Sequence, residues 1–369
     1  MSKYIGIMSG TSFDGIDAVL IDFTGDLPNT IGNYSLAMPT NIHDSLQQIA
    51  QTTQPHLLDN LYTLDAALGE LYSQAVEHLL KQTSTRSEDV VAIGCHGQTI
   101  RHFPNATPPW TVQIGDPNII AAKTGITTVA DFRRRDLAHG GQGAPFAPIF
   151  HHAFMQSSDE TRAVLNIGGF SNIAMLPTTG KVTGFDVGPG NILMDAWMQT
   201  QQNKPFDDKG AYAASGTLNK NLLARLLQHP FFAESPPKST GRDDFNFDWL
   251  QGILQGCQED IKPEDVQATL AELTAFTVAG AIEKYQPETK TLYICGGGAN
   301  NDYLLSRIDA LLPRVNVQTT EALGIHPQLS EAALMAWLAK QTMERKPVDL
   351  RDITGSSQPS ILGGVYYAS

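Results

Sequence analysis

Strand-length apolar runs alternate with helix-length apolar patterns along the chain, and this alternation restricts the possible folds more than any other feature. It is typical of α/β proteins, in which helices connect and cover the strands of a sheet. The expected strands are Tyr4–Ile7, Ala18–Phe23, Val90–Ile93, Ala163–Ile167, Asn172–Leu176 and Thr291–Cys295. The expected helices are Leu57–Gln82, Leu218–Leu227 with Thr217 as its N-cap, Pro263–Tyr285, and Ser330 to about Arg345.

The length and two similar glycine turns point to two domains. A chain of 369 residues, 41% of them hydrophobic, is long enough for more than one core. The glycine- and proline-rich passage Ala138–Pro148 is a candidate junction, although such a passage also suits an ordinary surface turn. Ile5–Asp22 and Ala163–Leu176 each read as a strand, a glycine turn and a second strand. We therefore expect two similar halves with a ligand cleft between them.

The charge and the cysteine content argue against several classes of protein. The formal net charge of −13 disfavours nucleic acid or an anionic membrane surface as the main partner. The 3 cysteines share no short spacing, which disfavours a disulfide framework or a zinc site and favours a reducing compartment. Asp14 and Asp17 interrupt the N-terminal apolar run, so we expect no signal peptide. No stretch reaches the roughly 18 apolar residues of a membrane span, and we expect a cytoplasmic protein.

The first glycine turn combines backbone N–H groups with hydroxyl groups. Ser9, Thr11 and Ser12 would add hydroxyl donors to a concave turn that suits phosphate oxygens. Asp14 and Asp17 would repel a bare phosphate, unless a divalent cation or its waters lay between them. A polar β-hairpin with glycine at positive φ fits the same spacing. The residues alone therefore leave a phosphate site and a structural hairpin as alternatives.

Several common motifs are missing from the sequence. The chain has no GxxxxGK[ST] phosphate loop, no GxGxxG between a strand and a helix, and no GxSxG nucleophile elbow. The histidines lack metal-ligand spacing. A nucleotide, if one is bound, is therefore held mainly by glycine turns and hydroxyl groups.

Asp186 is the sharpest catalytic candidate. We expect it to end a short strand, before a glycine–proline turn that restrains its backbone. A partly buried carboxylate in this place suits a general base, and the structural alternative is an Asx turn or a helix N-cap. Asn191 is better placed to cap the following helix, expected over Ile192–Gln199, which leaves Asp186 free.

Gly296, Gly297 and Gly298 follow an expected strand and precede an expected helix. Consecutive glycines let a backbone approach a flat ring or a sugar closely, and the helix N-terminus favours phosphate. An ordinary connection between a strand and a helix rarely needs three glycines. The pattern therefore favours a ligand here.

His96 and Glu331 each have a functional and a structural interpretation. His96 follows a buried strand, where it could reach a ligand cleft or act as a hydrogen-bonded structural histidine. Glu331 lies in the first turn of a helix, where the helix dipole alone favours a carboxylate. The residues themselves do not decide between these roles.

Motifs from the first strand to the last helix resemble those of the anhydro-N-acetylmuramic acid kinases, in the same order. The N-terminal pattern MSGTS-x-DGID is highly specific, and the resemblance covers nearly the whole chain. The matching motifs are SGTSFDGIDAVL, GCHGQTIRH, DFRRRD (Asp131–Asp136), LNIGGFSNI, GFDVGPGN, CGGGANN and EAALMAWLA.

The resemblance implies the actin-like ATPase fold of sugar kinases and Hsp70-type chaperones, with a nucleotide and sugar cleft between two α/β lobes. Residues 1–135 would form the N-terminal lobe and residues 136–329 the C-terminal lobe, while the helix within 330–369 would return to the first lobe. The family uses ATP and Mg²⁺ to open the 1,6-anhydro ring of anhydro-N-acetylmuramic acid and to phosphorylate the sugar, in cell-wall recycling. The products are N-acetylmuramic acid 6-phosphate and ADP, and a homodimer is implied.

The resemblance also implies roles for individual residues. Asp186 would deprotonate the attacking water, with Glu331 supporting the base or its water. Asp14 would hold Mg²⁺ directly or through water, and His96 and Arg133 would contact the sugar. The first phosphate loop would comprise Gly10, Thr11, Ser12, Phe13, Asp14, Gly15, Ile16 and Asp17. The second, Asn166–Asn172, would include Gly168 and Gly169, and the adenosine would be lined by Gly296, Gly297 and Gly298.

Two other functions remain as alternatives. One keeps the fold but changes the substrate to another sugar or a small carboxylate, with Asp186 deprotonating a substrate hydroxyl directly. The other is a nucleotide-dependent conformational module, or a sugar sensor that turns nothing over. The presence of Asp186, Asp14 and the glycine loops together argues against a sensor, and isotopically labelled water distinguishes the two kinases.

Overall fold

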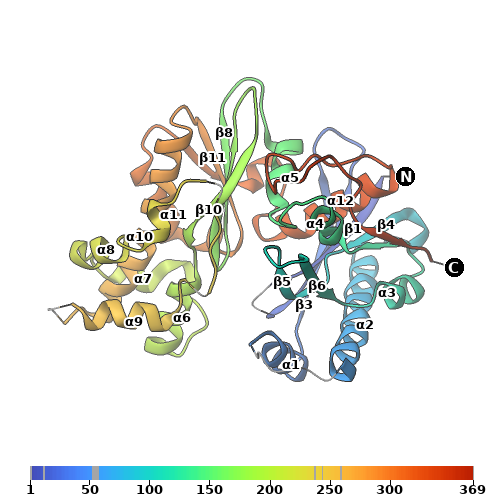
Figure 1. Cartoon of the computed structure of the whole chain (residues 1–369), viewed down its shortest axis with the longest axis horizontal. Coiled ribbons are helices and arrows are strands. Elements are labelled where there is room, and N and C mark those ends of the chain that lie inside the picture. Colours follow the sequence, from blue (N-terminus) through green and yellow to red (C-terminus); the bar gives the residue numbers. More distant parts are fainter. Residues whose placement is uncertain are drawn as a thin grey trace. The chain divides into compact units, whose positions relative to one another are not determined.

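The computed structural model describes residues 2–10, 13–51, 58–236, 238–242, 244–257 and 260–368. The chain divides into two compact units, each built around one main sheet (Figure 1). The first unit is assembled from two separate segments, Met1–Phe150 and Leu329–Ser369, and the second is His151–Gln328. The prediction of an α/β protein is confirmed. Within the described ranges, no helix is both long and apolar enough to cross a bilayer.

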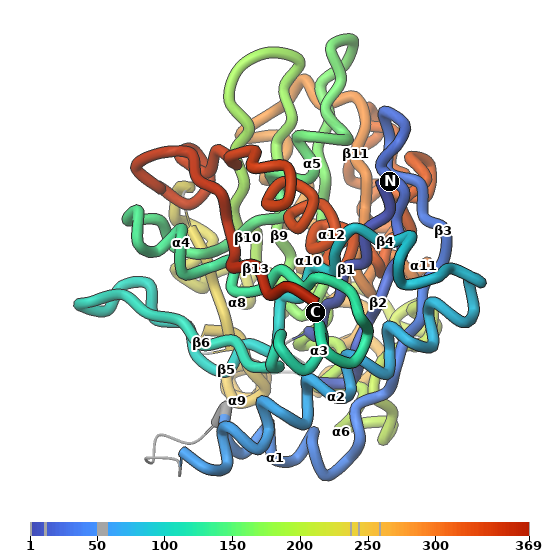
Figure 2. Tube along the Cα trace, turned by 90° about the vertical axis from the view of Figure 1, so that its right-hand side faces the viewer, coloured from blue at the N-terminus to red at the C-terminus, as the bar shows by residue number. Residues whose placement is uncertain are grey.

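The strands of the first unit form one main sheet and one separate hairpin. They are β1 (Lys3–Ser9), β2 (Gly15–Asp22), β3 (Asn29–Ala37), β4 (Val90–Cys95), β5 (Gln98–Phe103), β6 (Trp110–Ile114), β7 (Thr128–Ala130) and β13 (Gly364–Tyr366). In the main sheet β3, β2 and β1 are antiparallel neighbours, and β4 and β7 continue from β1 as parallel strands. β13 lies antiparallel to β7 at the edge, and β5 pairs with β6 (Figure 2).

The last long helix packs directly on the backbone of this sheet. A Cβ atom on Gly6 of β1 would lie 1.7 Å from the carbonyl oxygen of Ala332, and one on Gly94 of β4 would lie 2.0 Å from that of Met335. Only glycine allows so close an approach, and the helix therefore lies against β1 and β4 (Figure 2). The helices of this unit are α1 (Thr40–Gln51), α2 (Leu58–Gln82), α3 (Pro117–Thr124), α4 (Phe132–Ala138) and α12 (Ser330–Met343).

The second unit repeats the same strand plan. Its strands are β8 (Arg162–Ile167), β9 (Phe170–Leu176), β10 (Thr183–Pro189), β11 (Thr291–Cys295) and β12 (Asn316–Thr319). β10, β9 and β8 are antiparallel neighbours, and β11 and β12 continue from β8 as parallel strands. The order and directions match those of β3, β2, β1, β4 and β7. The similarity expected from the two glycine turns is therefore present in the strand order.

The helices of the second unit surround α10, which is buried along most of its length. They are α6 (Ile192–Gln202), α7 (Ala211–Ser215), α8 (Lys220–Leu226), α9 (Phe247–Gln255), α10 (Pro263–Tyr285) and α11 (Asp302–Leu311), and α5 (Ala147–Met155) begins in the first unit and ends in this one. α10 packs against α6, α7, α8, α11 and β10. Its apolar residues join the strands in one continuous core.

The starts of two helices, α8 and α2, were predicted at Thr217 and Leu57. The predicted N-cap Thr217 is wrong, because α8 begins later and is capped by Asn219, whose side-chain oxygen accepts a hydrogen bond from the Leu222 N–H at 2.9 Å. The Thr217 N–H instead donates to the Asp265 carboxylate at 2.6 Å. Leu57, the expected start of α2, lies outside the described residues.

Candidate functional site

The first glycine turn connects β1 to β2. Ser9 is buried, and its hydroxyl group forms a 2.7 Å hydrogen bond with the Tyr72 hydroxyl. Either oxygen can be the donor in this bond, so the expectation that Ser9 adds a hydroxyl donor to the turn stays a prediction. Thr11 and Ser12, the other expected donors, lie outside the described residues. The Gly10 carbonyl accepts a hydrogen bond from Gln98 Nε2 at 3.2 Å, which ties the turn to the start of β5.

The other predicted residues of this loop lie partly in the turn and partly in β2. Phe13 is buried and Asp14 is exposed. Gly15, Ile16 and Asp17 belong to β2, because the pairing with β1 continues as far as Ile16. The turn is therefore shorter than the predicted segment.

Asp14 is the carboxylate of this turn that fits a magnesium ion. The Asp17 carboxylate already accepts a 2.6 Å hydrogen bond from Ser35 Oγ, whereas Asp14 is exposed. No group of three or more metal-ligating side chains occurs among the residues that the structure describes. Mg²⁺ usually keeps several waters and binds one or two carboxylates together with phosphate oxygens. A single exposed aspartate beside a glycine turn is compatible with that pattern.

The second glycine turn, Gly168 and Gly169, lies against the start of α6. The Asn191 N–H donates to the Gly168 carbonyl at 2.8 Å, and the Ile192 N–H donates to the Gly169 carbonyl at 3.0 Å. A Cβ on Gly168 or Gly169 would meet no atom closer than 3.6 Å. Packing therefore does not require glycine at these positions, and the open space leaves the backbone accessible to a ligand. A glycine turn beside a helix N-terminus is a favourable arrangement for phosphate.

Asn191 occupies the N-cap position of α6 but does not cap it with its side chain. Its Nδ2 group lies 3.5 Å from the Ile167 carbonyl instead. Asn191 thus lies at the predicted N-cap position. Its side chain does not form the predicted capping hydrogen bond, because its backbone has helical rather than extended angles. The first N–H groups of α6 therefore have no side-chain cap from this residue.

The three consecutive glycines lie beside the second glycine turn. A Cβ on Gly296 would lie 2.4 Å from Asn166 Oδ1, and one on Gly298 would lie 2.3 Å from the Ile167 side chain. Packing against β8 therefore requires glycine at these two positions. A Cβ on Gly297 would meet only Asn191 Nδ2, at 3.8 Å. Gly297 is the member of the three that packing does not explain.

Asp186 lies within β10 and not at its end. β10 continues to Pro189 through an irregularity between Asp186 and Gly188, where the pairing with β9 shifts. The Asp186 N–H donates to the Lys238 carbonyl at 3.1 Å, and Asp186 Oδ2 accepts from the Thr240 N–H at 3.0 Å. The expectation that Asp186 ends the strand is wrong, because the bulge lets the strand pair beyond it.

Burial raises the pKa of the Asp186 carboxyl group to about 6. The Thr240 hydrogen bond and the nearby Lys238 charge oppose this rise but do not cancel it. A carboxyl group that titrates near neutral pH can both accept and release a proton under ordinary conditions. The surroundings of Asp186 therefore match those required of a general base.

His96 and Arg133, predicted separately, are joined by a hydrogen bond in the first unit. Arg133 Nε donates to His96 Nε2 at 2.9 Å, and His96 Nδ1 lies 2.7 Å from the Gly97 carbonyl, to which it donates. Burial, with the Arg133 charge second, lowers the pKa of His96 to about 3. His96 is therefore neutral, with its tautomer fixed by the two contacts.

Sequence reasoning missed the residues that hold Arg133 in place. Arg133 Nη1 donates to the Gly143 carbonyl at 2.7 Å, and the Gly143 N–H donates to Asp136 Oδ2 at 2.7 Å. Asp136 is fully buried, and its Oδ1 accepts from Thr354 Oγ1 at 2.8 Å. A chain of hydrogen bonds thus connects the C-terminal segment to His96. Asp136 and Thr354 lie more than two hundred positions apart, so no local sequence pattern indicates their hydrogen bond.

Glu331 is exposed in the first turn of α12. Its charge raises the pKa of Arg133, although burial has the larger effect and lowers that pKa to about 10. The position of Glu331 follows from the close packing of α12 on Gly6 and Gly94 described above. Glu331, Arg133, His96 and the first glycine turn therefore belong to the first unit, whereas Asp186, the second glycine turn and the three consecutive glycines belong to the second.

Comparison with known proteins identifies one family. The family model described as "Anhydro-N-acetylmuramic acid kinase" matches residues 2–368. A protein of that name from Coxiella burnetii (strain RSA 493 / Nine Mile phase I) is 47% identical over 367 residues, covering 99% of this chain and 97% of the relative. One from Saccharophagus degradans is 48% identical over 368 residues, covering 99% of both chains. One from Shewanella putrefaciens is 46% identical over 366 residues, covering 99% of this chain and 98% of the relative.

Solved structures with a similar course of the chain are more distant. Component A of the (R)-2-hydroxyglutaryl-CoA dehydratase from Acidaminococcus fermentans has a TM-score of 0.48 at 12% identity, covering 91% of this chain and 98% of its own. A ROK family glucokinase from Streptomyces griseus, in complex with glucose and AMPPNP, has a TM-score of 0.41 at 15% identity. The match covers 92% of this chain and 99% of the glucokinase chain. The duplicated strand order of the two units, and not these scores, is the feature that agrees with an actin-like ATPase fold.

Proposed function

This chain belongs to the anhydro-N-acetylmuramic acid kinase family, and we propose on that basis that it opens the 1,6-anhydro ring of anhydro-N-acetylmuramic acid and phosphorylates the sugar with ATP. The main support is the family match over residues 2–368. The products are N-acetylmuramic acid 6-phosphate and ADP, and the reaction belongs to cell-wall recycling. Because ATP is a cytoplasmic metabolite, the proposal places the protein in the cytoplasm.

Asp186 is the general base in this proposal. A water molecule bonds to C1 of the sugar while the bond between C1 and O6 breaks, and Asp186 accepts the proton of the water. O6, released from the ring, bonds to the γ-phosphorus of ATP, and ADP leaves with the electrons of the broken phosphorus–oxygen bond. Asp186 then returns its proton to solvent. A pKa of about 6 suits this cycle, because the carboxylate form predominates at neutral pH.

The glycine turns are the proposed nucleotide site. Gly168, Gly169 and Gly297 leave space that packing does not use, and they lie beside the N-terminus of α6, where the helix dipole favours phosphate. Gly10, with Asp14 as the magnesium ligand, contributes the first phosphate loop. When bound, Mg²⁺ neutralises charge on the phosphates during transfer.

A matched pair of substitutions tests the nucleotide site. Gly297→Ala adds a methyl group to open space and is expected to keep the thermal stability while it weakens ATP binding severalfold. Gly298→Ala drives the same methyl group into Ile167 and is expected to lower the melting temperature. Calorimetric ATP titration and thermal unfolding of both variants separate the two effects. Unchanged ATP affinity in Gly297→Ala would contradict the assignment of Gly297.

Arg133 and His96 are the proposed sugar contacts, with Glu331 supporting the base or its water. Arg133 uses Nε for His96 and one hydrogen of Nη1 for Gly143. Among the described residues, Nη2 and the second hydrogen of Nη1 have no hydrogen-bond acceptor, and they would serve the lactyl carboxylate of the sugar, which suits a guanidinium group. A homodimer is part of the proposal and is tested by the solution mass of the protein.

The experiment that tests the function uses ¹⁸O-water. The protein is mixed with Mg²⁺-ATP and anhydro-N-acetylmuramic acid in labelled water, and the molecular mass of the sugar product is measured by mass spectrometry. The expected product contains one added phosphate and one solvent oxygen. Unlabelled N-acetylmuramic acid 6-phosphate kept in the same water measures any later exchange at C1. A phosphorylated product without solvent oxygen would favour a kinase for a sugar hydroxyl, and absence of product would favour a sensor.

A further inference from the structure

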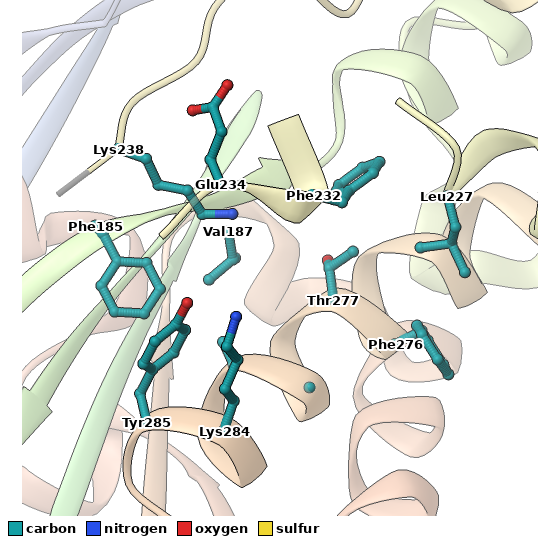
Figure 3. Close-up of a pocket in the computed structure, with 12 residues that line it drawn as sticks. Phe185, Val187, Leu227, Phe232, Glu234, Lys238, Phe276, Thr277, Lys284 and Tyr285 are labelled. Carbon is teal, nitrogen blue, oxygen red and sulfur yellow. The ribbon is translucent and has the colours of Figure 1, made fainter. Parts of the chain in front are cut away.

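A pocket of about 230 Å³ lies in the second unit, between β10, the segment that follows α8, and the C-terminal half of α10 (Figure 3). Phe185 and Val187 of β10 form one wall, and Phe232 and Phe276 contribute further apolar surface. The pocket is smaller than the roughly 300–1,000 Å³ of sites for drug-sized ligands. It therefore suits a small molecule with an apolar body.

Two ammonium groups and a hydroxyl group point into this pocket from opposite sides. Lys238 Nζ, Lys284 Nζ and the Tyr285 hydroxyl converge on the same space, whereas the carboxylate of Glu234 points away from it (Figure 3). Lys238 Nζ donates one hydrogen bond, to the Phe231 carbonyl at 3.1 Å, and lies 4.2 Å from the centre of the Phe231 ring. Within the described ranges, neither lysine forms an ion pair with a carboxylate. Burial is the main cause of a lowered pKa of Lys238; Lys284 acts in the same direction, whereas Tyr285, Glu234 and Asp186 oppose it.

Gly280 gives an independent indication that the pocket has a ligand. It lines the pocket from the interior of α10, where glycine costs about 1 kcal/mol relative to alanine. A Cβ on Gly280 would meet no atom within 4 Å, and its φ is not in the left-handed region. Neither packing nor backbone conformation therefore requires glycine. The residue keeps open a space that any larger side chain would begin to fill.

We propose that this pocket binds a small organic monoanion with an apolar body, such as an aromatic carboxylate. The apolar walls would hold the ring, and the carboxylate would accept hydrogen bonds from Lys238, Lys284 and the Tyr285 hydroxyl. The charges of Lys238 and Lys284 repel each other, and a bound anion between them reduces this repulsion. Glu234 at the edge of the pocket disfavours a second negative charge on the ligand.

The pocket shares structural elements with Asp186. Phe185 and Val187 are the neighbours of Asp186 in β10, and the segment 238–240 contacts both the pocket and the Asp186 backbone and carboxylate. A bound anion would neutralise the Lys238 charge, which lowers the pKa of Asp186, and would therefore leave a smaller fraction of Asp186 as the carboxylate base. We therefore expect occupancy to lower kcat without competing with the sugar, and this consequence rests on the proposed function.

Isothermal titration calorimetry with benzoate tests the site directly and requires no turnover. Benzoate is expected to bind at least about tenfold more tightly than acetate, which lacks the ring, or benzyl alcohol, which lacks the charge. Lys284→Gln is expected to weaken benzoate binding about tenfold, and Gly280→Leu to abolish it by filling the pocket. Lys220→Gln, at an exposed lysine of the same unit, is the matched control and is expected to change nothing.

Several results would overturn the proposal. Benzoate binding that is absent, or that Gly280→Leu and Lys284→Gln leave unchanged, would show that the pocket is not an anion site. Tighter binding of phenyl phosphate than of benzoate would contradict the assignment of a monoanion. A change of oligomeric state in Gly280→Leu, measured by light scattering, would identify the surface as a subunit contact instead. Competition between benzoate and the sugar in turnover assays would place the probe in the catalytic site.

Discussion

His96 in the first unit is buried and Asp186 in the second is half-buried, and their surroundings shift their protonation in opposite ways. Both ring nitrogens of His96 are hydrogen-bonded, and the lowered pKa of about 3 keeps the ring neutral at any physiological pH. Among the described residues, one hydrogen bond reaches the Asp186 carboxylate, and burial raises its pKa to about 6. Hydrogen bonds at both ring nitrogens fix the protonation state of His96. Burial with few hydrogen-bond donors instead lets the Asp186 carboxyl group gain or lose a proton near neutral pH. In the proposed mechanism, the first unit would therefore position the sugar and the second would transfer the proton.

The strongest test of this comparison is Asp186→Asn. The amide keeps the shape of the side chain but cannot accept a proton, so kcat is expected to fall by about 10²–10⁴-fold while ATP binding stays within twofold or so. Steady-state kinetics and calorimetric ATP titration measure the two quantities. Near-normal turnover would move the base elsewhere, with Glu331 as the next residue to replace.

Arg133→Lys tests whether the first unit acts by positioning. Lysine keeps the charge but loses the Nε donor to His96 and the planar fork. We expect kcat/KM to fall about tenfold or more, mainly through a higher KM for the sugar. Arg135→Lys, at an exposed residue of the same helix, is the matched control. A loss confined to kcat would place Arg133 in the chemical step.

The pH dependence of kcat/KM separates the two titratable residues. Below pH 6 the rate is expected to fall about tenfold per pH unit, because protonated Asp186 cannot act as a base. An ordinary histidine would titrate near the same pH, but His96 does not. His96→Gln should therefore lower activity without moving the midpoint of the acid limb. A midpoint that shifts in this variant would show that His96 titrates in the working range.

The smallest expected effect is on stability. The folded-state pKa of Asp186 is raised, so the folded protein binds this proton more tightly than the unfolded chain. The resulting stabilisation is complete below about pH 4 and is lost as pH rises through about 6. Asp186→Asn removes this loss and should stabilise the protein at pH 7 by roughly 1–2 kcal/mol, or a few degrees in melting temperature. Equal gains at pH 4.5 and pH 7 would contradict a buried, ionised Asp186.

The buried strands were predictable because their apolar runs are continuous. β1, β4, β8 and β11 all lie where such runs predict them. β3 was not predicted, since its side chains alternate between exposed and half-buried at the edge of the sheet. The pattern of residues also led to His96 and Asp186 as candidates, and the family resemblance added Arg133. The pattern could not reveal the hydrogen bond between His96 and Arg133, or the support of Arg133 by Asp136, because both depend on how distant segments fold together.

The close packing of α12 on Gly6 and Gly94 has a consequence for synthesis on the ribosome. Translation delivers all of the second unit before it delivers the helix that lies on Gly6 and Gly94. β1 and β4 of the nascent first unit therefore stay uncovered until α12 leaves the exit tunnel. By then the whole sequence of the second unit has already left the tunnel. We therefore expect the usual order of co-translational folding, in which the N-terminal domain folds first, to be reversed here, because β1 and β4 are covered by a helix that is synthesised after the second unit.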